Sequence, residues 1–210
     1  MSARSRAAEI LADAGAVITG SHVVYTSGRH GSAYVNKDAV YPHTDRVSEL
    51  CRLLSDATRD PRPEVVCGPA LGGIILAQWT GHHLGALAVY AEKLPDGGLG
   101  LRRGYDRLVA GRRVLVVEDV LNTGGSVRQA VAAVRAAGGD VVAVGALCNR
   151  GGVTAADLGV PELIALVELS LDSWDAAACP LCRDGVPIDT RVGKGREFLA
   201  ARGATGVMGR

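Results

Sequence analysis

The sequence predicts an α/β fold, in which a central, mostly parallel sheet is flanked by helices. The first observation is a series of short Val, Leu, Ala and Ile runs that alternate with helical segments. The second is that these runs are apolar throughout, which is typical of strands covered on both faces. The third is the composition, with 48% hydrophobic but only 4% aromatic residues, so small aliphatic side chains must build the core. A chain of 210 residues is long enough to bury such a core.

The expected elements follow one another in a regular order. A short helix over 4–14 precedes two strands over 23–35, which flank a glycine turn. A second helix over 44–58 shows the i, i+3, i+4, i+7 spacing of apolar residues, with Thr44 as its N-cap. The remaining expected elements are strand 64–68, helix 72–84, strand 86–90, strand 113–119, helix 125–137, strand 140–149 and strand 163–169.

The domain organisation and the broad class follow from length, charge and composition. We expect a single domain over 1–202, with a small hood built largely from 1–40 and a flexible tail over 203–210. A formal net charge of +1 speaks against a nucleic-acid partner. The N-terminus lacks the apolar segment of a secretory signal, and no apolar run reaches the roughly 18 residues of a membrane span. We therefore expect a soluble, cytoplasmic protein without a membrane partner.

The most informative segment runs from Val114 to Val127 and reads VLVVEDVLNTGGSV. An apolar strand ends here in two acids, and a glycine turn leads into a helix. Ligands of open α/β sheets bind at the carboxyl ends of strands, and the N–H groups at a helix N-terminus favour a phosphate. The glycines allow close backbone approach, while Thr123 and Ser126 offer hydroxyl groups. The segment therefore predicts a phosphate site.

Glu118 and Asp119 narrow this prediction from a phosphate to a phosphoribosyl group. A site that bound only phosphate would not favour two negative charges beside it. Carboxylates accept charge-assisted hydrogen bonds from ribose hydroxyls. They also stabilise the positive charge that develops on a sugar when its glycosidic bond breaks through an oxocarbenium-like transition state. The alternative is a strand that ends in two acids before a capped helix, without any ligand.

The segment 114–127 resembles the signature with which type I phosphoribosyltransferases bind 5-phosphoribosyl 1-pyrophosphate (PRPP). Other segments resemble orotate phosphoribosyltransferases, especially a bacterial and archaeal branch with an LRRG loop and a C-terminal CPLC motif. These segments are TSGRHGSAYVNKD (26–38), CGPALGGI (67–74), YAEKLPDGGLGLRRGY (90–105), LCNRGG (147–152) and CPLCRDGVP (179–187). The resemblance implies the type I phosphoribosyltransferase fold and the transfer of a phosphoribosyl group from PRPP to orotate, in pyrimidine (UMP) biosynthesis. It also implies a homodimer and a Mg²⁺ cofactor that is held mainly by PRPP, without a dedicated protein metal site.

The same resemblance implies roles for individual residues. Two loops would bind PRPP, through Glu118, Asp119, Val120, Leu121, Asn122, Thr123, Gly124, Gly125 and Ser126 and through Ala70, Leu71, Gly72 and Gly73. The catalytic residues would be Glu118, Asp119, Lys93 and Arg103. Both cations lie at or in the long stretch 94–112, which would close over the leaving pyrophosphate. Orotate would be bound by Asn122, Arg150 and Arg29.

Plainer interpretations stay open beside these roles. Arg29 also fits a solvated surface residue, Arg150 a structural arginine at a strand end, and 94–112 an ordinary surface loop. Asn122 stands where the family mostly has Thr.

A guanidinium pairs well with the carboxylate of orotate, which adenine, guanine and hypoxanthine lack. A phosphoribosyltransferase for another nucleobase and a non-catalytic, PRPP-sensing regulator remain the alternatives.

The pair Cys179 and Cys182 forms a CxxC motif, which is half of many metal sites. One such pair without a second is weak evidence. None of the histidines has ligand spacing around it in the sequence, at His22, His30, His43, His82 and His83. We therefore expect a tight turn with free thiols here.

Overall fold

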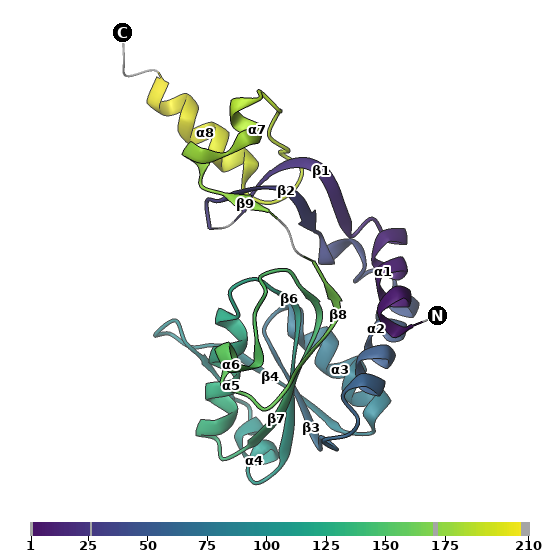
Figure 1. Ribbon diagram of the computed structural model, residues 1–210. Coiled ribbons are helices and arrows are strands. Elements are labelled where there is room, and N and C mark those ends of the chain that lie inside the picture. The colour runs from purple at the N-terminus through teal and green to yellow at the C-terminus, as the bar shows by residue number, and fades with distance from the viewer. Residues whose placement is uncertain (1, 26, 170–171, 207–210) are drawn as a thin grey trace. The chain divides into compact units, whose positions relative to one another are not determined.

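The computed structural model describes residues 2–25, 27–169 and 172–206 (Figure 1). Within this part, the chain forms two compact units. The first unit comprises Met1–Ile10 and Tyr41–Ser170, and the second comprises Leu11–Val40 and Leu171–Arg210. No helix in the described ranges is long and apolar enough to span a membrane.

The first unit holds a sheet that has six strands in the described chain, in the order β5-β4-β3-β6-β7-β8. Their bounds are Val65–Pro69 (β3), Leu87–Lys93 (β4), Leu99–Gly100 (β5), Arg113–Leu121 (β6), Asp140–Asn149 (β7) and Leu163–Glu168 (β8). The short β5 pairs antiparallel with β4, and the other pairs are parallel. The predicted α/β class with a mostly parallel sheet is confirmed.

Helices cover both faces of this sheet (Figure 1). Those of the first unit are Ala3–Asp13 (α1, which continues into the second unit), Thr44–Ala57 (α2), Gly72–Leu84 (α3), Tyr105–Val109 (α4), Gly125–Ala136 (α5) and Ala155–Leu158 (α6). The connection β3–α3–β4 runs toward one edge of the sheet, whereas β6–α5–β7 runs toward the other. Since such crossovers are right-handed, α3 and α5 lie on opposite faces. The reversal between β3 and β6 leaves a crevice at their carboxyl ends, where open sheets bind ligands.

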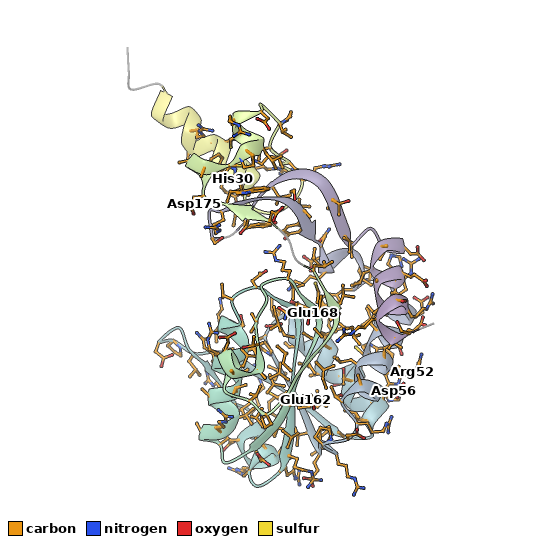
Figure 2. All side chains as sticks on the ribbon, viewed as in Figure 1. His30, Arg52, Asp56, Glu162, Glu168 and Asp175 are labelled. Carbon is orange, nitrogen blue, oxygen red and sulfur yellow. The ribbon has the colours of Figure 1, made fainter. Side chains whose placement is uncertain are left out.

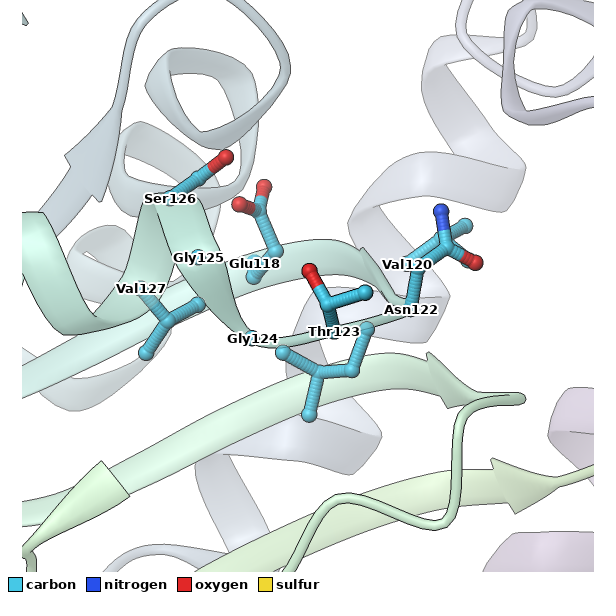
Figure 3. A pocket seen from close by; sticks show the side chains of 9 residues that line it. Glu118, Val120, Asn122, Thr123, Gly124, Gly125, Ser126 and Val127 are labelled. Carbon is cyan, nitrogen blue, oxygen red and sulfur yellow. The ribbon is translucent and has the colours of Figure 1, made fainter. Parts of the chain in front are cut away.

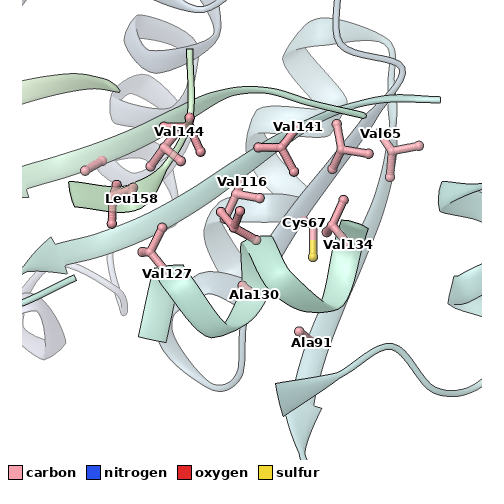
Figure 4. Packing of buried hydrophobic residues seen from close by; sticks show 14 of the residues in the cluster. Val65, Cys67, Ala91, Val116, Val127, Ala130, Val134, Val141, Val144 and Leu158 are labelled. Atoms are coloured by element: carbon pink, nitrogen blue, oxygen red, sulfur yellow. The ribbon is translucent and has the colours of Figure 1, made fainter. Parts of the chain in front are cut away.

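Apolar packing fixes the position of α5, whose N-terminus follows the glycine turn. Val127, Ala130, Val131 and Val134 repeat at i, i+3, i+4 and i+7 and are buried. Figure 4 shows the first, second and fourth of these residues beside valines of β3, β6 and β7, and all four belong to one buried cluster. Burying one valine side chain contributes roughly 1.5–3 kcal/mol. The helix therefore holds its first turn firmly beside the end of β6.

Two differences from the prediction in the first unit concern the start of α2 and the stretch 94–112. Thr44 is the first residue of α2, and the N-cap is His43, which makes no side-chain cap hydrogen bond. The prediction of Thr44 as N-cap is therefore wrong by one residue. The stretch 94–112 contains β5 and α4, because a turn closed by the Leu94 N–H and the Gly98 carbonyl folds it back onto β4.

The second unit combines the two ends of the chain. Its sheet, with three strands in the described residues, has the order β1-β2-β9. The bounds are Val17–Val24 (β1), His30–Val35 (β2), Ser173–Trp174 (β9), Pro180–Arg183 (α7), Gly195–Gly206 (α8), and two 3-10 turns, Lys37–Ala39 (η1) and Ala176–Ala178 (η2). The C-terminal segment thus joins the hairpin expected in the hood. Helix α8 overlaps the predicted tail over 203–210, of which 207–210 lie outside the described residues.

Candidate functional site

Glu118 and Asp119 lie near the carboxyl end of β6 and are only 8% and 5% exposed. Backbone N–H groups hold both carboxylates. The Asp119 N–H lies 3.1 Å from Glu118 Oε1, and the Val120 N–H lies 2.6 Å from Asp119 Oδ1. Burying a charge is costly unless it is hydrogen-bonded or paired. These hydrogen bonds therefore offset part of the cost of burying two acids at the crevice between β3 and β6.

The turn after β6 forms a pocket of about 170 Å³ (Figure 3). Its lining residues are Glu118 and the whole run from Val120 to Val127. Gly124 has a φ of +72°, and a Cβ there would come within 2.8 Å of Leu158, so the turn requires glycine. Pockets for whole drug-sized ligands measure roughly 300–1,000 Å³. A smaller pocket at the N-terminus of α5 suits a single anionic group.

Tyr41 links this carboxylate pair to the next loop, and nothing in the sequence pattern indicated it. Its hydroxyl lies 2.9 Å from the carbonyl oxygen of Gly72 and 3.1 Å from Asp119 Oδ2. Burial, and next the negative charge of Asp119, raise the pKa of Tyr41. The hydroxyl therefore keeps its proton and acts as a hydrogen-bond donor to Gly72 and Asp119.

The loop between β3 and α3 carries the second set of predicted PRPP residues, 70–73. A Cβ on Gly73 would come within 2.7 Å of Pro69 and 2.8 Å of the Gly68 Cα, so the backbone is tightly packed there. The Ala70 N–H donates to the Ala91 carbonyl at 2.8 Å. This amide is thus bound within the sheet. Leu71, whose side chain is 82% exposed, precedes α3, and the first N–H groups of that helix have no intrahelical acceptor.

Arg150 and Asn122 meet where β7 ends. The backbone N–H groups of Arg150 and Gly151 both donate to the Leu121 carbonyl, at 3.0 and 3.1 Å. The Arg150 Nε donates to the side-chain oxygen of Asn122. Asn149, buried and absent from the predicted set, donates from Nδ2 to the Val153 carbonyl at 2.9 Å and so shapes the turn. The structure therefore brings Arg150 next to the phosphate turn.

The cations of the long stretch lie beside β4. Lys93 is the last residue of β4 and is exposed. Arg103 forms an ion pair with Glu92 at 3.1 Å, and this hydrogen bond raises the pKa of Arg103. Its guanidinium also lies 5.9 Å from the centre of the Tyr90 ring. Any movement of Arg103 toward a leaving group would thus begin by breaking its pair with Glu92.

Arg29 belongs to the second unit. Its guanidinium donates to the side chain and the carbonyl of Ser173, at 3.1 and 2.6 Å, and pairs with Asp175 at 2.8 Å. These bonds hold the arginine on β9. Its predicted contact with orotate stays a prediction.

Two kinds of metal donors are present. Glu118 and Asp119 offer oxygen atoms, which suit Mg²⁺ bound through one or two carboxylates plus substrate phosphates. The other group lies in the second unit, where His22, His30, Cys179 and Cys182 place their ligand atoms within 4.8 Å of one another. The expectation that no histidine accompanies the CxxC pair is therefore wrong, because tertiary folding brings β1 and β2 beside α7.

Comparisons with known proteins agree with this geometry. Residues 36–162 match the model of the phosphoribosyl transferase domain. The orotate phosphoribosyltransferase of Pelotomaculum thermopropionicum is 40% identical over 184 residues, which cover 88% of this chain and 94% of the relative. That of Caldanaerobacter subterraneus subsp. tengcongensis is 37% identical over 82% of this chain and 88% of the relative.

Solved structures show the same relationship. The orotate phosphoribosyltransferase of Mycobacterium tuberculosis in complex with PRPP has a TM-score of 0.62 to this chain at 28% identity. The match covers 80% of this chain and 97% of the other. The resemblance inferred from the motifs is confirmed, and the chain belongs to the orotate phosphoribosyltransferases, within the phosphoribosyl transferase domain family.

Proposed function

We propose that the protein transfers the phosphoribosyl group of PRPP to orotate, giving orotidine 5-phosphate and pyrophosphate. The observation that carries this proposal is the buried pair Glu118 and Asp119 beside a glycine turn, at the point where the strand order reverses. The names of the curated relatives support the choice of orotate.

The phosphate turn and the carboxylates would bind different parts of PRPP. The 5-phosphate fits the pocket at 122–126, where the N-terminus of α5 supplies N–H groups and partial positive charge. The ribose hydroxyls then donate to Glu118 and Asp119. As the bond to pyrophosphate breaks, the same carboxylates stabilise the positive charge that develops on the ribose. No protein nucleophile is needed, because the site positions two reactants and stabilises the separated charges.

The leaving pyrophosphate would meet the loop between β3 and α3. Gly72 and Gly73 offer the first N–H groups of α3, while Ala70 and Leu71 shape the approach. Lys93 and Arg103 would supply positive charge when the stretch 94–112 closes, and closure would also exclude water from the cationic sugar. In this step Arg103 would exchange Glu92 for the pyrophosphate.

Orotate would lie against the end of β7. The guanidinium of Arg150 can pair with the orotate carboxylate, and Asn122 orients that guanidinium through its side-chain oxygen. An Asn in place of the more usual Thr thus keeps an acceptor for Arg150. The resemblance also implies an orotate contact for Arg29.

The cofactor, the assembly and the location complete the proposal. Mg²⁺ would be held mainly by PRPP, with Glu118 and Asp119 as the oxygen donors of this chain, and it would neutralise charge on the leaving pyrophosphate. We further propose a homodimer and a cytoplasmic location. Light scattering during size-exclusion chromatography tests the dimer, because a monomeric mass at micromolar concentration would exclude it.

The decisive experiment measures pyrophosphate release from PRPP with orotate, uracil, hypoxanthine and adenine in turn. We expect turnover with orotate alone. Turnover with a purine and none with orotate would reject the substrate. Binding of PRPP without turnover on any base, together with salt-sensitive binding of DNA or RNA, would favour a regulator.

A further inference from the structure

Two histidines and two cysteines form a compact cluster in the second unit, hereafter the His/Cys cluster. His22 lies on β1 and His30 on β2. Cys179 is the N-cap residue of α7, and Cys182 lies within that helix. Figure 2 labels His30 within this unit. His22 and His30 are 1% and 0% exposed, and Cys179 is 3% exposed. Buried polar side chains of this kind need partners, because burial without them is costly.

The hydrogen bonds select the ring nitrogens that face the cysteines. His22 Nδ1 lies 2.7 Å from the Val186 carbonyl, which can only accept a hydrogen bond, so Nδ1 carries the proton. In the neutral ring Nε2 then carries a lone pair that can accept a hydrogen bond or bind a metal, and this atom faces both sulfurs. A histidine that donates its other N–H to a backbone carbonyl is the usual arrangement of a metal ligand. The Val186 carbonyl thus orients His22 for coordination.

His30 offers the second nitrogen. Its Nδ1 lies 2.9 Å from His22 Nε2 and 3.4 Å from the sulfur of Cys182. Its Nε2 is buried and has no hydrogen-bond partner among the described residues, while the ring packs edge-on against Phe198. The ring is therefore held by packing, with Nδ1 directed at Cys182 and His22.

The distances within the cluster match a tetrahedron around one metal ion. Zinc bonds of about 2.0 Å to nitrogen and about 2.3 Å to sulfur give N–S edges of about 3.5 Å and an N–N edge of about 3.3 Å. The sulfurs of Cys179 and Cys182 lie 3.6 and 3.7 Å from His22 Nε2, and the Cys182–His30 distance is 3.4 Å. The N–N distance of 2.9 Å would widen by a few tenths of an ångström.

We propose that His22, His30, Cys179 and Cys182 bind one Zn²⁺ as a closed, structural site. Two thiolates and two imidazoles are a donor set that zinc takes in structural sites, and four protein ligands leave no open position for substrate. Softer donors of this kind disfavour Mg²⁺, which prefers oxygen. The site is thus separate in chemistry from the carboxylates that would meet Mg²⁺ on PRPP.

The metal would join the two ends of the chain. The backbone already links them weakly, since His30 pairs with Trp174 of β9 and His22 forms an isolated bridge with Ile188. Strand β9 has only two residues, so few ladder hydrogen bonds hold it. A zinc ion bound by β1, β2 and α7 would cross-link these segments, as structural zinc sites do in small modules with little core.

Metal analysis of the purified protein, with any affinity tag removed, tests the proposal. We expect about one zinc per chain after dialysis against metal-free buffer. Replacing the zinc with Co²⁺ should give the intense visible absorption of a tetrahedral cobalt site and a thiolate-to-cobalt charge-transfer band. The cobalt spectrum uses the unaltered chain, so it decides the question even where a variant fails to fold.

Matched variants separate the cluster from other cysteines and histidines. Cys182→Ala and His22→Gln should lower the zinc content to less than about a tenth of the wild-type value, since a structural site needs all four ligands. Cys51→Ala and His82→Gln change residues outside the cluster, and both variants should retain the wild-type zinc content. The proposal is overturned if the reduced wild-type protein binds neither zinc nor Co²⁺ through thiolates. A Cys179–Cys182 disulfide in protein purified without reductant, with no metal bound after reduction, would overturn it equally.

Discussion

The phosphate turn and the His/Cys cluster are two candidate binding sites of opposite construction. The turn lies within one stretch from Glu118 to Val127, whereas His22 and Cys179 are 157 positions apart. A strand end, a glycine turn and a helix N-terminus are local features, so their order along the chain already describes the site. The cluster forms only because a C-terminal segment adds β9 and α7 to the β1–β2 hairpin. A CxxC pair alone therefore carries little information until the fold supplies its partners.

The largest expected effect tests whether the phosphate turn is the reactive site. The double change Glu118→Gln with Asp119→Asn should lower turnover more than about 100-fold, equivalent to ~2.7 kcal/mol of barrier, because the ribose loses both carboxylates. Zinc content should stay unchanged. The control is Glu162→Gln, labelled in Figure 2, with Asp140→Asn, and these exposed carboxylates lie at the amino ends of β8 and β7, respectively. Steady-state kinetics decide, and turnover within about tenfold of wild type would reject the ribose-binding role.

The next effect concerns the base. Arg150→Ala should raise the KM for orotate about 30-fold, since a hydrogen-bonded charged pair contributes roughly 2 kcal/mol. The orotate KM of Arg150→Lys should lie between those of the wild type and Arg150→Ala, because lysine keeps the charge but cannot pair bidentately. The KM for PRPP serves as the internal control and should change little. An orotate KM within twofold of wild type would leave Arg150 as a structural cap of β7.

Metal removal probes the other region. Chelation of zinc should increase hydrogen exchange of β1 and β2 amides about tenfold, because local opening of the second unit becomes easier. Amides of β3, β6 and β7 should exchange as before. Mass spectrometry of exchanged peptides measures both at once. Equal loss of protection in both units would show that the metal does not stabilise the second unit alone.

The smallest effect tests the tyrosine between the two loops of the first unit. Tyr41→Phe should lower kcat/KM for PRPP about fivefold, near 1 kcal/mol, because Asp119 loses one hydrogen-bond donor. Tyr34→Phe on β2 is the matched control and should leave kcat/KM unchanged. Equal kinetics for both variants would show that the backbone N–H of Val120 suffices to position Asp119.

The sequence predicted most of the first unit because its patterns are local. Continuous apolar strands and the spacing of Val127, Ala130, Val131 and Val134 mark elements whose burial needs no knowledge of their neighbours. The shortest strands and helices were not predicted. The two-residue strands β5 and β9 have no period of their own, and α6 is four residues long. Their conformations depend on the elements they pair with or pack against.

The sequence by itself determined the strand, acids and glycine turn of 114–127 and, through them, the family. The acids follow the strand directly, and the turn leads straight into a helix, so bonded neighbours suffice to specify the pocket. Only the tertiary structure decided that Tyr41 connects Gly72 to Asp119, that Asn122 receives Arg150, and that two histidines meet the CxxC pair. Contacts between distant segments depend on strand order and register, and no spacing within one segment encodes them.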